Sequence, residues 1–164
     1  MSSTFHLPPT VLARVFSPQE CRQMIDFAET QMWNVEKDSV DDQPAWELEV
    51  LTTNAGQMAS TRLHERIVLL RPEIKIQKYA IYIRKYAADA RPDLAPHEDR
   101  SLVSFTAALN DRFEGGTFIS IAQDGTETEI PLTTGDAVVF SGNVLHGIRP
   151  VQSGTRYSIV MHCI

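Results

Sequence analysis

The hydrophobic period of this chain changes to two at about residue 74, and this change constrains the fold more than any other feature. From Ile74 onward apolar and polar side chains alternate, as in 103–109, with one slip between Ile76 and Tyr79 that indicates a bulge. Turn residues interrupt the alternation at 115–116, 124–125, 135–136 and 153–154. Many short strands with frequent turns predict an all-β barrel or jelly roll.

Two helices are predicted before this region. The segment Ser17-Pro18-Gln19-Glu20 has the residues of a capping box, with proline at the first helical position. The apolar residues behind it fall on one helical face: Cys21, Met24, Ile25 and Ala28. A second helix is expected from about 58 to 70, ended by Pro72, and residues 46–50 alternate as a strand.

Length and composition are those of one globular domain. The chain has 164 residues, of which 43% are hydrophobic and 22% charged, so it can bury a sizeable core. We therefore expect a single domain over 1–164. Its helical front, at about 1–72, should cover one face of a β core at about 74–164.

Composition also disfavours several classes of protein. No apolar run reaches the roughly eighteen residues of a membrane span, and the start of the chain does not look like a secretory signal. Cys21 and Cys163 have no metal-binding or redox spacing, so we expect them reduced in a cytoplasmic protein. The net charge of −6 and the lack of a basic cluster argue against a nucleic-acid partner.

Four acidic residues cluster at Glu36, Asp38, Asp41 and Asp42. The preferred interpretation is a solvated loop, since charge runs usually face water. Recognition of a basic peptide is the weaker alternative.

The first chemical motif is His97-Glu98-Asp99. In an extended segment residues two apart point to the same side, so His97 and Asp99 would face one point in space. His146 lies 49 residues later and adds the second imidazole of a two-histidine, one-carboxylate set, which non-haem iron(II) oxygenases use with three coordination positions left open. A structural zinc site would be closed by a fourth ligand, and spacing alone leaves only His162 as a candidate.

Arg156 follows His146 by ten residues, early in the predicted last strand. A guanidinium can fix the far carboxylate of a dicarboxylate cosubstrate through two charge-assisted hydrogen bonds. Ser158 would point to the same side of that strand and add a donor. The alternative for Arg156 is an ordinary exposed arginine on an edge strand.

Taken in order, these residues resemble the catalytic core of the prolyl/lysyl hydroxylase family of iron(II)- and 2-oxoglutarate-dependent dioxygenases. The resemblance covers about half the chain, from Tyr86 to Ile164. The matching stretches are Lys85-Tyr86, Pro96-His97-Glu98-Asp99, Ala108-Leu109-Asn110, Phe113-Glu114-Gly115-Gly116, Gly135-Asp136, Leu145-His146, Pro150-Val151 and Gly154-Thr155-Arg156-Tyr157.

Details of the resemblance are closer to the lysyl than to the prolyl branch. Tyr86 stands eleven residues before His97, and arginine occupies the position that binds the oxo acid within the stretch 154–157. Ala108 stands where some prolyl hydroxylases have a tyrosine. The lysyl enzymes that modify collagen are large and secretory, whereas this chain is short and its start does not look like a secretory signal, which argues against collagen as the substrate.

The resemblance implies a double-stranded β-helix, a cupin-like jelly roll, that binds Fe(II), 2-oxoglutarate and O2, with ascorbate as a candidate addition. The implied reaction is hydroxylation of a lysyl or prolyl residue in a peptide or protein, or of a free amino acid. The family's roles carry over to these positions: metal ligands at His97, Asp99 and His146, the far carboxylate of 2-oxoglutarate at Arg156, and further cosubstrate contacts at Tyr86 and Ser158.

Two other classes stay open at this point. A non-enzymatic cupin-like barrel could bind a metal or an oxo acid, because one fold hosts many functions. A zinc hydrolase on the same barrel would act without 2-oxoglutarate or oxygen.

Overall fold

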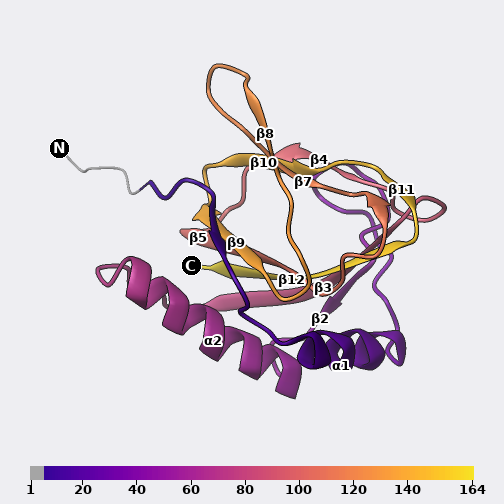
Figure 1. The fold of residues 1–164 in the computed structure, drawn as a ribbon, viewed down its shortest axis with the longest axis horizontal. Helices are drawn as coiled ribbons and strands as arrows, with labels where there is room; N and C mark the ends of the chain where they lie inside the picture. Colours follow the sequence, from indigo (N-terminus) through magenta and orange to yellow (C-terminus); the bar gives the residue numbers. More distant parts are fainter. Residues whose placement is uncertain (1–5) are drawn as a thin grey trace.

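The computed structural model describes residues 6–164, so the first five residues of the predicted helical front lie outside the described residues. Two antiparallel sheets face each other, and two helices lie against the outer face of the larger one (Figure 1). The predicted jelly roll, covered on one side by N-terminal helices, is confirmed. No helix among the described residues is long and apolar enough to cross a membrane.

The larger sheet has six strands in the order β1-β9-β5-β12-β3-β2. Its strands are β1 (Thr10–Leu12), β2 (Glu47–Glu49), β3 (Tyr79–Ala87), β5 (Val103–Ala108), β9 (Ala137–Ser141) and β12 (Thr155–Cys163). The smaller sheet has the order β4-β10-β7-β8, and a two-stranded ladder joins β11 to β6. These strands are β4 (Leu94–His97), β6 (Glu114–Gly115), β7 (Phe118–Ile121), β8 (Glu127–Ile130), β10 (Leu145–Ile148) and β11 (Val151–Ser153).

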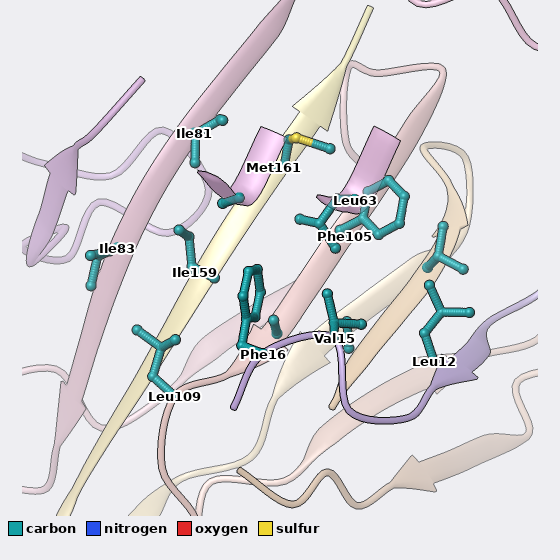
Figure 2. Close-up of a cluster of buried hydrophobic side chains, with 14 of the residues drawn as sticks. Leu12, Val15, Phe16, Leu63, Ile81, Ile83, Phe105, Leu109, Ile159 and Met161 are labelled. Carbon is teal, nitrogen blue, oxygen red and sulfur yellow. The ribbon is translucent and has the colours of Figure 1, made fainter. Parts of the chain in front are cut away.

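The main core lies between the larger sheet and the helices α1 (Pro18–Glu29) and α2 (Asn54–Leu70). Figure 2 shows Leu63 of α2 among side chains of β3, β5 and β12, including Ile81, Phe105 and Ile159. All four are fully buried. Burial of such side chains stabilises a fold by about 1.5–3 kcal/mol each, so this layer anchors the sheet whose other face carries the site.

Helix α1 begins as the sequence predicts. The Ser17 hydroxyl accepts a hydrogen bond from the Glu20 amide (3.1 Å), and the Glu20 carboxylate accepts one from the Ser17 amide (2.9 Å). Helix α2 begins four residues earlier than predicted, because the Thr53 side chain caps it by accepting from the amide of Gly56. A Cβ at Gly56 would lie 1.9 Å from the carbonyl oxygen of Val50, so glycine is required there.

The predicted bulged strand through Ile74 and Ile76 is wrong, since β3 starts only at Tyr79. The segment before it runs along the chain's end instead, and the amides of Gln77 and Lys78 both donate to the carbonyl oxygen of the last residue (2.7 and 3.0 Å). Ile74 and Ile76 still pack against the core, which explains their apolar alternation without a strand.

Residues 34–46, here called the arm, form a narrow hairpin closed by isolated bridges beside β2. The predicted solvated loop is wrong for Asp38 and Asp41, although Glu36 and Asp42 are exposed. Asp38 is buried and pairs with Arg84 (2.8 Å) and with the fully buried Arg91 (3.2 Å); Asp41 pairs with Arg91 at 3.1 Å. These ion pairs hold the arm against β3 and against the loop between β3 and β4 that carries Arg91.

Candidate active site

A cavity of about 570 Å³ lies between the two sheets, with the arm at its margin. Alternate residues of β3 and β12 line it, among them Tyr82, Arg84, Arg156 and Ser158. Because strand side chains alternate between faces, the intervening residues of β12 point to the helix-covered core, as Ile159 does. The same two strands therefore build both the core and the cavity.

His97, Asp99 and His146 come together at this cavity. His97 ends β4 and pairs directly across the ladder with His146 of β10, while Asp99 follows in the turn after β4. One ligand atom from each residue lies within 4.8 Å of the other two. Asp99 Oδ1 is 3.2 Å from His97 Nε2, and Asp99 Oδ2 is 3.7 Å from His146 Nε2.

Backbone carbonyls orient both imidazoles. The Nδ1 atoms of His97 and His146 each lie 2.9 Å from the carbonyl oxygen two residues earlier, of Ala95 and Val144 respectively. A carbonyl only accepts, so each Nδ1 carries the hydrogen and each Nε2 presents its lone pair toward Asp99 when the ring is neutral. Two Nε2 atoms and one carboxylate facing one point fit the donor set of a divalent metal ion.

Protonation states also suit a metal. Burial alone would raise the pKa of Asp99, but hydrogen bonds with His162 and His97 and the nearby His146 hold it well below its ordinary value. Burial, together with the neighbouring imidazoles, lowers the pKa of His146 to about 4. Burial opposes protonation of His97, yet its hydrogen bond with Asp99 raises its pKa. At neutral pH the carboxylate is therefore ionised and His146 is neutral, as metal binding requires.

Aromatic rings pack around His146. Phe118 stacks on its imidazole with a centroid distance of 5.5 Å and an interplanar angle of 17°, and Phe140 approaches to 4.5 Å. This contact shields one side of the three-residue cluster from water.

Arg156 places a buried positive charge in the cavity. It is only 4% exposed, one guanidinium nitrogen donates to the Ser158 hydroxyl (3.1 Å), and its centre lies 5.3 Å from the Tyr86 ring centroid. Among the described residues no carboxylate forms an ion pair with it, whereas nearby Arg84 is paired with Asp38. A buried cation without an anion is costly, so this position suits an anionic ligand.

The structure thus brings all six predicted residues to one cavity, the alternative of an exposed Arg156 being wrong. His162, left open as a fourth ligand, lies beside Asp99 but outside the converging three. Sequence reasoning missed Ser104, whose hydroxyl donates to Asp99 Oδ2 (2.6 Å). No local pattern marks this serine, because its role depends on strand register.

Comparison with known sequences found no matching family model. The chain is 39% identical over 74 residues to a PKHD-type hydroxylase of Maricaulis maris, which covers 40% of this chain and 33% of that protein. It is 30% identical over 115 residues to the human 2-oxoglutarate and iron-dependent oxygenase domain-containing protein 2, and this match covers 62% of this chain and 33% of that protein. The chain spans about one third of the length of these relatives.

Solved structures match over nearly the whole chain. A Pseudomonas putida prolyl-4-hydroxylase superposes with a TM-score of 0.78 at 17% identity, over 94% of this chain and 91% of that one. The fold is that of the 2-oxoglutarate and iron-dependent oxygenases. A Trichoplax adhaerens prolyl hydroxylase, solved with a peptide fragment of hypoxia inducible factor, gives a TM-score of 0.74 at 11% identity, over 95% of this chain and 83% of that one. The predicted double-stranded β-helix is confirmed, and the sequence relatives are named PKHD-type hydroxylases and 2-oxoglutarate and iron-dependent oxygenase domain proteins.

Proposed function

We propose that this chain is the catalytic region of an iron(II)- and 2-oxoglutarate-dependent hydroxylase. His97, Asp99 and His146 would hold the metal, and Arg156 would bind the far carboxylate of 2-oxoglutarate. One observation carries the proposal: a facial set of two imidazoles and a carboxylate opens into the same cavity as a buried arginine that lacks an anionic partner. The relatives, which are named hydroxylases and oxygenases, support it.

When bound, iron(II) with 2-oxoglutarate supplies the chemistry that places one atom of O2 in succinate and the other in an unactivated C–H bond, with release of carbon dioxide. The chain's own residues bind, orient and exclude water. Tyr86 packs against the Arg156 guanidinium and Ser158 hydrogen-bonds it, so both hold the guanidinium in place. Phe118 and Phe140 keep the His146 side of the cluster dry.

The proposed substrate is a lysyl or prolyl side chain of a peptide or protein, or a free amino acid. Support for a peptide comes from the Trichoplax relative in fold, which was solved with one. The closer likeness to lysyl hydroxylases, the help of ascorbate and the cytoplasmic location stay predictions from the sequence.

The test is a single-turnover reaction. The protein is loaded anaerobically with Fe(II) and 2-oxoglutarate, a panel of amino acids and Lys- or Pro-containing peptides is added, and oxygen is then admitted. We expect succinate, and in one panel member the mass gain of one oxygen atom. Tight 2-oxoglutarate binding without any succinate would instead indicate a binding protein, and bond hydrolysis without 2-oxoglutarate or oxygen would indicate a zinc hydrolase.

Two variants connect the residues to the reaction. His97→Ala should abolish turnover and metal binding together, since it removes one of three ligands. Arg156→Met should abolish turnover at ordinary 2-oxoglutarate concentrations while metal binding persists. If both variants turn over like the wild type, the site lies elsewhere.

A further inference from the structure

The Asp99 carboxylate is held by two residues that do not belong to the metal-binding motif. Asp99 Oδ2 accepts a hydrogen bond from the Ser104 hydroxyl (2.6 Å) and lies 3.4 Å from His162 Nδ1. Ser104 of β5 and His162 of β12 are direct cross-strand partners in the larger sheet. Their side chains therefore share the cavity face and reach the carboxylate from the same side.

The hydrogens of this group can be assigned from the donor inventory. A serine has one hydroxyl hydrogen, and Ser104 gives it to Asp99, so the Ser104 oxygen can only accept from its other neighbours. Those neighbours are the Ser101 hydroxyl (2.8 Å) and His162 Nδ1 (3.1 Å). His162 Nδ1 therefore carries a hydrogen that points between two oxygens, Ser104 Oγ and Asp99 Oδ2.

The two carboxylate oxygens of Asp99 consequently have different surroundings. Oδ2 faces two donors and also lies 3.7 Å from His146 Nε2, whereas Oδ1 lies 3.2 Å from His97 Nε2. The torsion that swings an aspartate carboxylate is broad and roughly two-fold, so without such donors the group would sample several orientations. Partners that orient a ligand in this way typically contribute about 10–100-fold to metal affinity.

The main chain of Asp99 is fixed separately. Its amide donates to the carbonyl oxygen of Gly142 (2.8 Å), and a Cβ at Gly142 would lie 2.1 Å from the carbonyl oxygen of Ser101. Close packing of these two turns places the Asp99 backbone independently of its side chain. Removing Ser104 or His162 should therefore release only the carboxylate.

We propose that Ser104 and His162 are positioning residues that clamp Asp99 Oδ2 and so keep Oδ1 directed at the metal ion. This inference rests on the proposed function, because it assumes that Asp99 is a metal ligand. It assigns to His162 a role through Asp99 and not as a fourth ligand.

The test uses Mn(II) as a redox-stable probe, with its dissociation constant measured by electron paramagnetic resonance. Ser104→Ala and His162→Phe each remove one donor and should raise the Mn(II) dissociation constant about 10–100-fold. His162→Asn keeps an N–H close to the position of Nδ1 and should stay within about threefold of the wild type. In the Co(II) form, the visible spectrum of His162→Asn should match that of the wild type, since its ligands are unchanged.

A matched control is His64→Phe. His64 is a half-buried histidine of α2 that hydrogen-bonds Tyr79 away from the cavity, and its replacement should leave Mn(II) affinity unchanged. Melting temperatures of the metal-free variants distinguish a variant that fails to fold from one that folds but binds metal weakly. Ser104→Ala and His162→Phe test the proposed role in holding Asp99 Oδ2 independently of each other.

Three results would overturn the inference. Wild-type affinity in both Ser104→Ala and His162→Phe would show that the carboxylate needs no clamp. Equal loss in His162→Asn and His162→Phe, with an altered Co(II) spectrum, would make His162 a ligand. Failure of the wild-type protein itself to bind Mn(II) would remove the proposed metal site and with it this role, which distinguishes the two failures.

Discussion

Replacing Arg156 by methionine should weaken cosubstrate binding and stabilise the metal-free, cosubstrate-free protein at the same time. Methionine keeps the length of an unbranched apolar stem but removes the charge. The opposite signs follow from one fact: the guanidinium is buried without an anion until a ligand supplies one. A residue with only a packing role would change both properties in the same direction.

Both magnitudes can be worked out. Truncating one partner of a buried, hydrogen-bonded charge pair costs about 2–5 kcal/mol, which corresponds to about a 30- to 4000-fold rise in the dissociation constant of 2-oxoglutarate. Without ligand, burial of an unpaired ion costs several kcal/mol, partly offset by the Ser158 hydrogen bond and by the Tyr86 ring. A net increase of about 1–2 kcal/mol in the free energy of unfolding of Arg156→Met would raise its melting temperature by about 2–8 °C.

The assay pairs calorimetric titration of 2-oxoglutarate into the Mn(II) protein with a thermal melt of the ligand-free protein. Arg84→Met is the matched control: Arg84 lines the same cavity but is paired with Asp38 and Glu47. Its loss removes the Arg84 partner of Glu47 and leaves Asp38 paired with Arg91, so it should lower the melting temperature. Unchanged 2-oxoglutarate affinity in Arg156→Met would refute the reasoning, as would a fall in melting temperature equal to that of Arg84→Met.

Three further outcomes are expected. Gly135→Ala should cost about 3 kcal/mol or more in a urea titration, because a Cβ at this residue (φ +90°) would lie 2.1 Å from a main-chain oxygen, whereas Gly125→Ala (φ +85°, open space) should cost about 1 kcal/mol. The hydrogen bond from Arg62 lowers the pKa of Glu20 to about 2 from 4.5, so the ionised carboxylate stabilises the folded protein fully above pH 4.5, and this stabilisation is lost as the pH falls toward 2. The melting temperatures of the wild type and Glu20→Gln should therefore differ at pH 6 and converge near pH 2. Burial raises the pKa of both cysteine thiols, to about 11 and about 12, so neither should react with a thiol reagent at pH 8 until the protein unfolds.

Local signals predicted the parts of the fold that depend on near neighbours. The capping box at Ser17 and Glu20 satisfies its own amides within four residues, so the start of α1 could be predicted to the residue. Alternation in β12 likewise assigned Arg156 and Ser158 to one face, which is the cavity face. The convergence of His146 with His97 has no local signal, because it depends on the pairing of β10 with β4. In advance it was supported by the two-histidine, one-carboxylate set and by the family resemblance.

Parts that depend on distant partners could not be predicted. The acidic cluster looked solvated because the guanidiniums that bury Asp38 come from Arg84 and Arg91, 46 and 53 residues away. Ser104 lies only five residues after Asp99, but its side chain shares a face with His162, 58 residues away, through the register of β5 with β12. Charge patterns and motif spacing describe a single segment, whereas these contacts are set by which strands become neighbours.

Strand β12 sets the positions of several residues of the proposed site. It is a central strand, paired over its whole length with β3 and over six positions with β5, and its alternate residues fill the helix-covered core. A shift of one residue would exchange the two faces, placing Arg156 and His162 in the apolar core and Ile159 in the cavity. Core packing therefore enforces the register that places Arg156 and His162 at fixed positions along one strand. The arm, by contrast, lines the cavity without belonging to this ladder.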